Sequence, residues 1–159
     1  MITMDEAVRI VLEHTQPIDA GSVDLMDALG RTLAEDVRSD IDMPPFDKSA
    51  MDGYAVVGAD VAQASRGAPA VLDVVEEIPA GAIPRKSVSA GKAARIMTGA
   101  PVPDGADTVV MVEDTVDGPN GRSVKVLSPT KPGENIARLG EDVRCDQVVL
   151  EAGTALRPP

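Results

Sequence analysis

Aromatic residues are almost absent from this sequence, which holds one Phe, one Tyr and no Trp among 159 residues. A single cysteine, Cys145, excludes an internal disulfide, and with a single histidine, His14, it excludes a zinc site made of Cys and His. No apolar run approaches the roughly 20 residues of a membrane span. The polar residues 3–6 lack the basic start of a signal peptide. We therefore expect a cytoplasmic protein with no membrane partner.

Basic residues are also scarce: 26 acidic residues outnumber 15 basic ones, and the net charge is −11. Because nucleic-acid binding needs a cationic face, this balance argues against a nucleic-acid partner. It also argues against the chain holding a polyanionic ligand by itself. A phosphorylated ligand would need a bridging divalent cation, or positive charge supplied from elsewhere.

The N-terminal segment predicts a helix followed by shorter elements. Thr3 and Glu6 fit a capping box, and the apolar stripe behind them predicts a helix over residues 4–14. A second short helix is expected over 26–35, and a strand over 37–41.

Between residues 44 and 139, Gly and Pro recur every few residues, and the pattern favours strands over helices. The expected elements are strands over 71–78, 93–97, 108–112 and 123–127, a hairpin loop over 117–121 and a short helical stretch near 58–64.

Two short strands are expected near the end of the chain, at 148–150 and 155–156. They need sheet partners, and the strands before residue 44 are the natural candidates. The expected fold class is therefore α+β and β-rich, with an elongated arrangement. Its parts are an N-terminal helix (1–17), a small discontinuous α/β domain (18–43 plus 140–159) and an inserted antiparallel β domain (44–139).

The only two aromatic rings, Phe46 and Tyr54, flank one polar segment. Large rings bury much area, so both are expected to anchor the loop between them. Its carboxylates can bind Mg²⁺ or act as acid and base. An ordinary Asp-Gly turn is the alternative. The polar residues of this segment are Asp47, Lys48, Ser49 and Asp52.

Two further segments carry candidate chemistry. Thr98-Gly99 follows an expected strand and could expose backbone N–H groups to an oxyanion, although an ordinary strand exit would look the same. Arg138, Glu141 and Asp142 cluster near the return into the first domain, where a solvated hinge is the alternative.

Taken together, these segments resemble the N-terminal half of molybdopterin molybdenumtransferase, the family called MoeA in bacteria and represented by the E domain of gephyrin in animals. The resemblance covers nearly all of the chain. It is carried by the segments 45–55, 80–81, 95–101, 105–110, 133–136, 140–142 and 153–154.

The resemblance implies an enzyme that inserts molybdate into adenylylated molybdopterin and releases AMP with the help of Mg²⁺. It implies a homodimer, and the preceding molybdopterin adenylyltransferase as a candidate partner. Asp52, Thr98 and Asp142 match family positions linked to activity, with Asp52 and Asp142 as the expected metal ligands. The neighbouring residues expected to contact the cofactor are Asp47, Lys48, Ser49, Gly99 and Glu141.

Family members are more than twice as long as this chain. The chain is therefore expected to be an N-terminal part, inactive alone, that forms one wall of the active site. The alternative is a non-catalytic module for dimerisation or partner docking, in which the carboxylates are structural.

Overall fold

The computed structural model describes residues 2–158, which form two compact units. The terminal unit holds the residues before Arg38 together with those after Gln147, and the β unit is Arg38–Gln147. The domain boundaries expected at 43/44 and 139/140 stay a prediction. In the structure, residues 38–43 and 140–147 group with the β unit.

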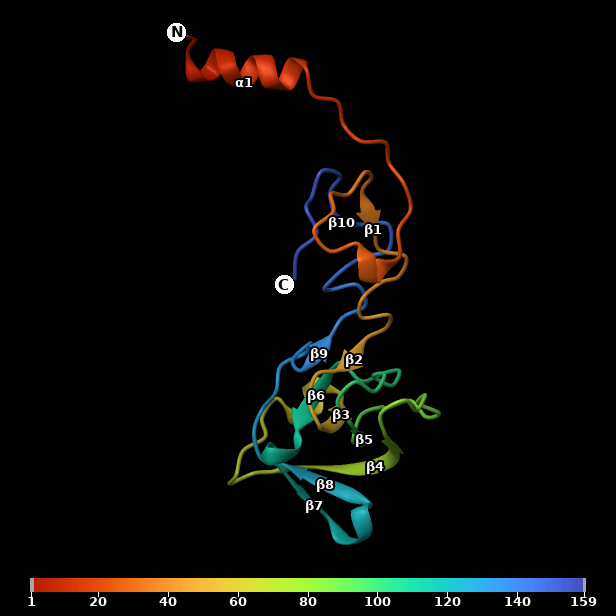
Figure 1. The fold of residues 1–159 in the computed structure, drawn as a ribbon. Coiled ribbons are helices and arrows are strands. Elements are labelled where there is room, and N and C mark those ends of the chain that lie inside the picture. The colour runs from red at the N-terminus through yellow and green to blue at the C-terminus, as the bar shows by residue number, and fades with distance from the viewer. Residues whose placement is uncertain (1, 159) are drawn as a thin grey trace. The chain divides into compact units, whose positions relative to one another are not determined.

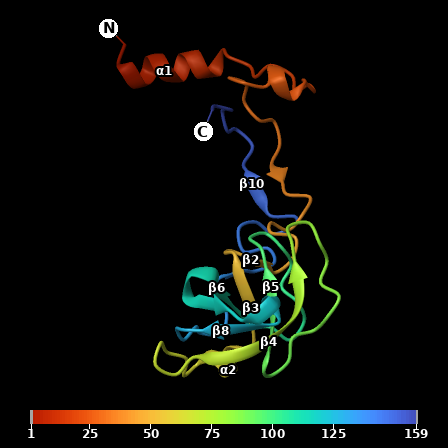
Figure 2. The same ribbon diagram turned by 90° about the horizontal axis from the view of Figure 1, so that it is seen from below.

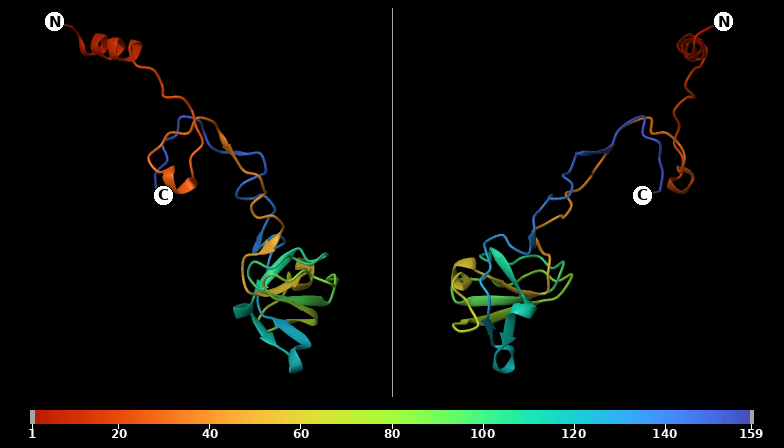
Figure 3. Two further views of the ribbon diagram at one scale, coloured as in Figure 1. Left: turned by 45° about the vertical axis from the view of Figure 1, so that its right-hand side comes forward. Right: turned by 90° about the vertical axis from the view of Figure 1, so that its left-hand side faces the viewer.

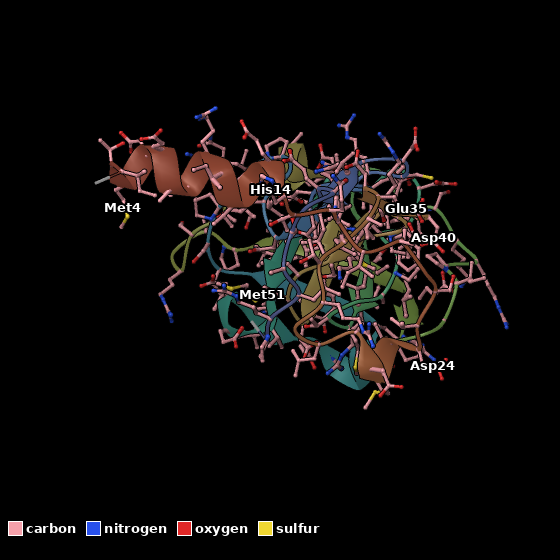
Figure 4. The ribbon with its side chains drawn as sticks, turned by 45° about the horizontal axis from the view of Figure 1, so that its top comes forward. Met4, His14, Asp24, Glu35, Asp40 and Met51 are labelled. Carbon is pink, nitrogen blue, oxygen red and sulfur yellow. The ribbon has the colours of Figure 1, made fainter. Side chains whose placement is uncertain are left out.

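The terminal unit begins with helix α1 (Met4–Glu13), which confirms the helix predicted there. The Thr3 hydroxyl accepts the Glu6 N–H at 3.2 Å, as its place in the capping box requires. No residue of α1 is buried, and the side chains between Met4 and His14 project outward (Figure 4). The apolar stripe that predicted the helix is therefore exposed. Among the described residues, no helix is long and apolar enough to cross a membrane.

The second helix predicted over 26–35 is wrong. The structure has one 3₁₀ turn, η1 (Leu25–Asp27), and Gly30 then takes a positive φ of 78°. The Gly30 N–H donates to the Leu156 carbonyl at 2.9 Å instead of closing a helical turn. Backbone pairing between distant segments has replaced the local hydrogen bonds of a helix.

The segment around residues 37–38 pairs with late residues of the chain in a small ladder. Strand β1 (Val37–Arg38), shorter than the predicted 37–41, pairs with β10 (Val148–Leu150). An isolated bridge joins Thr32 to Ala155. The prediction that the late strands pair with the chain before residue 44 is confirmed.

A six-stranded sheet dominates the β unit, in the order β6-β3-β5-β4-β8-β7 (Figures 1 and 2). Neighbours are antiparallel except for the parallel pair β4–β5, so the sheet is mixed where the sequence predicted an antiparallel one. Four of its strands lie within a few residues of those predicted: β4 (Ala70–Ile78), β5 (Lys92–Ile96), β6 (Thr108–Met111) and β8 (Ser123–Val126). The other two, β3 (Gly53–Val56) and β7 (Thr115–Asp117), were not predicted.

Short elements complete the β unit. They are β2 (Lys48–Ser49), which pairs antiparallel with β9 (Ile136–Ala137), the helix α2 (Gly58–Val61), and the 3₁₀ turns η2 (Val112–Asp114) and η3 (Pro119–Gly121). The turn η3 lies in the predicted hairpin loop, and the hairpin of β7 and β8 projects from the sheet in both views of Figure 3. The α+β, β-rich class expected from the sequence is confirmed.

The six-stranded sheet curls on itself. Three strands separate β3 from β7 in the sheet order, yet the Tyr54 hydroxyl on β3 donates to an Asp117 carboxylate oxygen on β7 at 2.6 Å. A flat sheet would hold these groups more than 15 Å apart, at about 4.8 Å per strand. The hydrogen bond therefore joins the edge strand β7 to β3 across the inside of the curled sheet.

Strand β3 is the centre of the core, because it is buried on both faces. Tyr54 and Val56 pack into one hydrophobic cluster, and Ala55 packs into the other. Gly53 is required where β3 meets β6, since a Cβ at this position would lie 1.9 Å from the Val110 carbonyl oxygen. The loop before Gly53, which carries the candidate site, thus emerges from the most constrained strand of the unit.

Candidate functional site

The loop between β2 and β3 is shaped by a buried serine. Ser49 is 1% exposed; its hydroxyl donates to the Met51 carbonyl at 2.5 Å and accepts the Met51 N–H at 3.3 Å. These bonds within the loop close a tight turn of the kind Ser favours. The turn places Asp52 at the surface, directly before β3.

Asp52 and Thr98 form the centre of the candidate site. One Asp52 carboxylate oxygen, Oδ1, accepts the Thr98 backbone N–H at 2.7 Å and the Thr98 hydroxyl at 2.9 Å. Thr98 follows β5, the neighbour of β3, so the sheet itself brings the two residues together. The backbone N–H of Thr98, and then its hydroxyl, lower the pKa of Asp52 below its ordinary value. The carboxylate is therefore held ionised at the surface.

The Thr98-Gly99 backbone does not form an open anion cup. The Thr98 N–H is occupied by Asp52, and the Gly99 N–H donates to the Ser49 carbonyl at 2.8 Å. Gly99 has a φ of 82°, which glycine adopts at no steric cost. Of the two interpretations of this segment, the structure favours the strand exit, which here orients the Asp52 carboxylate.

Asp47 holds the other end of the loop through two bonds. Its Oδ2 accepts from the Arg138 guanidinium at 2.6 Å, and its Oδ1 accepts the Leu139 N–H at 2.8 Å. The Leu139 N–H first, and then Arg138, lower the pKa of Asp47. Glu141 supports this arrangement, because its carboxylate accepts the Arg138 N–H at 2.7 Å. Asp47 thus holds the returning chain against the loop, and Glu141 shapes the turn of the returning chain that carries Arg138.

The prediction that both aromatic rings anchor this segment is half right. Tyr54 is 2% exposed, whereas Phe46 is 42% exposed. The bonds between Asp47 and the returning residues Arg138 and Leu139 fix the Phe46 end instead. Polar contacts have taken the role expected of the ring.

Asp142, the other expected metal ligand, lies in the returning segment after Gly140. Its backbone N–H donates to the Met43 carbonyl at 2.9 Å, and its side chain is exposed. No hydrogen bond within residues 2–158 joins its carboxylate to Asp52 or Thr98. The same part of the chain contains no group of three or more His, Cys, Asp or Glu side chains that could hold a metal ion.

Lys48 is the one cation among the residues expected to contact the cofactor. Its backbone pairs with Ala137 on β9 and bridges to Pro101, and its side chain is half-buried. Lys48 makes no ion pair within the described residues. It is therefore available to an anionic ligand beside an otherwise acidic loop.

Asn135 makes two contacts near the site that the sequence did not predict. Its carbonyl accepts the Ala50 N–H at 2.9 Å, and its side-chain amide donates to the Val109 carbonyl at 2.8 Å. Its φ of 60° lies in the region that Asn tolerates better than most residues. An Asn after Gly133-Glu134 could have suggested a turn of this type, but not its distant partners.

Comparisons with known proteins show the family to which this chain belongs. The family model described as the MoeA N-terminal region, domains I and II, matches residues 2–159. The chain belongs to the MoeA family. A MoeA relative in Bacillus subtilis, named molybdopterin molybdenumtransferase, is 43% identical over 159 residues, which are 99% of this chain and 37% of that protein. A Nostoc protein of the same name is 46% identical over 140 residues, covering 88% of this chain and 30% of its own length.

A solved MoeA structure has the same fold. The crystal structure of the molybdopterin biosynthesis MoeA protein from Pyrococcus horikoshii matches with a TM-score of 0.89 and 44% identity. The match covers 97% of this chain and 40% of that one. The chain thus spans well under half the length of these MoeA relatives.

Proposed function

We propose that this chain forms one wall of the active site of a molybdopterin molybdenumtransferase in molybdenum cofactor biosynthesis. The reaction is the insertion of molybdate into adenylylated molybdopterin with release of AMP. Family membership supports the reaction class. The observation that carries the proposal for this chain is the Asp52 carboxylate, held ionised at the surface by two hydrogen bonds from Thr98.

The Asp52 arrangement suits work on a phosphoanhydride. Thr98 occupies only Oδ1 of the carboxylate, so Oδ2 remains to orient water or to meet a cation. Because the carboxylate is ionised, it can accept a proton or a hydrogen bond without first losing its own proton. Thr98 acts on Asp52, fixing where that free oxygen points.

The described part of the chain offers two carboxylates that fit a Mg²⁺ ion, but not a complete set of ligands. Mg²⁺ is usually held by one or two carboxylates, with water and substrate phosphates completing its shell. Asp52 and Asp142, both exposed, would be the protein ligands of such an ion. When bound, the ion would offset the negative charge of the phosphates. The described residues provide no third acidic, His or Cys ligand for it, so the remaining ligands would come from the substrate, water or another chain segment.

We propose that Lys48 and Gly99 lie against the anionic substrate, because Lys48 makes no ion pair among the described residues and lies beside the loop that carries Gly99. Asp47, Ser49 and Glu141 are engaged in bonds that shape this site. That these residues also contact the cofactor stays a prediction.

A net charge of −11 argues against this chain binding adenylylated molybdopterin and molybdate alone. We therefore propose that the rest of the active site comes from a further part of the protein or from the partner in a homodimer, and that the chain is inactive by itself. The adenylyltransferase that makes the substrate is a proposed partner, and the proposed location is the cytoplasm. No nucleic-acid or membrane partner is proposed.

The test is a chimera in which this chain replaces the matching segment of the Bacillus subtilis relative. AMP release from adenylylated molybdopterin, molybdate and Mg²⁺ is measured for the chimera, for Asp52→Asn and for Asp73→Asn. Asp73 is an exposed β4 carboxylate that makes no side-chain hydrogen bond or ion pair among the described residues. We expect Asp52→Asn to lower AMP release at least about 100-fold, the lower range for one acid–base group, and Asp73→Asn to leave it unchanged.

A non-catalytic docking module is the second candidate function. The exposed apolar face of α1 favours it, with Leu12 68% and Met4 81% exposed, and so does the structural use of Asp47. Under this function the chimera with Asp52→Asn keeps full AMP release. Met4→Ser and Leu12→Ser would instead weaken self-association, measured by analytical ultracentrifugation of this chain.

A further inference from the structure

Asn135 has an unusual backbone for a residue that is not glycine. Within residues 2–158, only Asn135 and Asp146 combine a side chain with a positive φ, at 60° and 66°. Such a conformation persists when the surrounding contacts hold it, and residues of this kind cluster at functional sites. The contacts of Asn135 therefore indicate what its conformation serves.

The contacts of Asn135 run in two directions. Its side-chain amide donates to the Val109 carbonyl on β6 at 2.8 Å, and its carbonyl accepts the Ala50 N–H at 2.9 Å. The preceding residue is tied to the same strand, because the Glu134 carbonyl accepts the Val109 N–H at 3.1 Å and the Thr108 hydroxyl at 3.2 Å. Asn135 thus links a buried strand to the loop that carries Asp52.

Ala50 lies two residues before Asp52, within the turn that Ser49 closes. Beyond Asp52, the Val112 N–H donates to the Asp52 carbonyl at 3.0 Å. The loop is therefore held on one side by Asn135 and on the other by Val112. Hydrogen bonds weaken steeply as their geometry departs from the optimum, so a small drift of Ala50 would disturb the bonds between Asp52 and Thr98.

We propose that Asn135 is the positioning residue of the candidate site: its left-handed backbone and its amide together set where Asp52 meets Thr98. The relevance of this role to catalysis rests on the proposed function, whereas the role itself is a statement about geometry. It can be tested in this chain without any enzymatic assay.

The test compares Asn135→Gly and Asn135→Asp by NMR spectroscopy of this chain. Asn135→Gly keeps the positive φ and removes only the amide, so it is the variant that disturbs folding least. Asn135→Asp keeps the shape and places a carboxylate oxygen against the Val109 carbonyl. Asp146→Gly is the matched control, because it changes the other positive-φ residue, which lies in a separate turn where its N–H donates to the Ser39 carbonyl.

The readouts are the Thr98 amide proton shift and the exchange rate of the Ala50 amide, with the Ala94 amide of central strand β5 as the reference for global opening. In both Asn135 variants we expect the Thr98 proton to move upfield and Ala50 to exchange about tenfold faster, while Ala94 is unchanged. Asp146→Gly should leave all three signals in place.

The proposal is overturned if Thr98 and Ala50 keep their wild-type signals in both folded variants. It is also overturned if Ala50 and Ala94 accelerate together, since Asn135 would then support the whole fold and not the site. Loss of AMP release in the Asp52→Asn chimera bears on the proposed function alone, so the two hypotheses can fail separately.

Discussion

The bond between Tyr54 and Asp117 gives the sharpest test of the curled sheet. Tyr54→Phe removes only the hydroxyl that donates to Asp117 at 2.6 Å. A hydrogen bond to a charged group contributes about 1.5–3 kcal/mol, and Asp117 is half exposed, so water replaces part of the loss. We therefore expect the free energy of unfolding to fall by about 1–2 kcal/mol at neutral pH, measured by urea denaturation with circular dichroism.

The same residue predicts a pH dependence. Burial first, and then the bond to Asp117 and its charge, raise the pKa of Tyr54 from 10.0 to about 12. The native state therefore keeps the proton longer than the unfolded state. This contribution to stability is complete below pH 10 and is lost as the pH rises through the native pKa. At about pH 11 the wild type should have lost roughly 1.4 kcal/mol through Tyr54 alone.

Because Tyr54→Phe has no such proton to lose, the stability difference between the two proteins should shrink by that amount at about pH 11. Tyr54 is the only tyrosine, so the ultraviolet absorbance of tyrosinate reports its ionisation directly. Asp117→Asn keeps a hydrogen-bond acceptor without the charge, and it should lower the titration midpoint. A wild-type midpoint near 10 in the folded protein would refute this reasoning, as would a stability difference independent of pH.

Two further changes test the core and the loop. Gly53→Ala brings a Cβ to 1.9 Å from the Val110 carbonyl oxygen, and it should lower the free energy of unfolding by about 2–4 kcal/mol, measured by urea denaturation. The control is Gly67→Ala, which has open space around it and should lower that free energy by less than about 1 kcal/mol. Equal effects of the two substitutions would contradict the close approach of Gly53 to Val110. The bonds that lower the pKa of Asp47 stabilise the native state at pH values above the pKa of Asp47 in the unfolded chain, and this stabilisation is lost as the pH falls through its native pKa. The acid unfolding of Asp47→Asn should therefore depend less steeply on pH than that of the wild type. An unchanged acid transition would count against the ion pair with Arg138.

Local patterns in the sequence were enough to predict much of the fold. The Thr3 cap and the stripe behind it predicted α1, and alternation over 123–127 predicted β8. The predicted helix over 26–35 failed because Gly30 pairs with Leu156, a partner that no local pattern names. The parallel pairing of β4 with β5 was missed for the same reason, since strand direction depends on the whole topology.

The site was predictable in part. Asp52 and Thr98 were both candidates, and the sheet pairing of β3 with β5 brings them into contact. That Thr98 donates hydrogen bonds to Asp52 could not be predicted, because the two residues are 46 positions apart in the sequence. The inward hydroxyl of Ser49 and the pairing of Asp47 with Arg138 likewise depend on burial and on distant backbone.

The dependence of Ala50 on Asn135 has a consequence for the order of events during synthesis. The residues of the Asp52 loop leave the ribosome early, but Asn135, whose carbonyl accepts the Ala50 N–H, is encoded near the end of the β unit. Contacts between distant residues form only after the intervening chain has been made and its loop closed. Until residues 133–136 emerge, the nascent loop lacks the Asn135 link that completes its native contacts, however early its own sequence was translated.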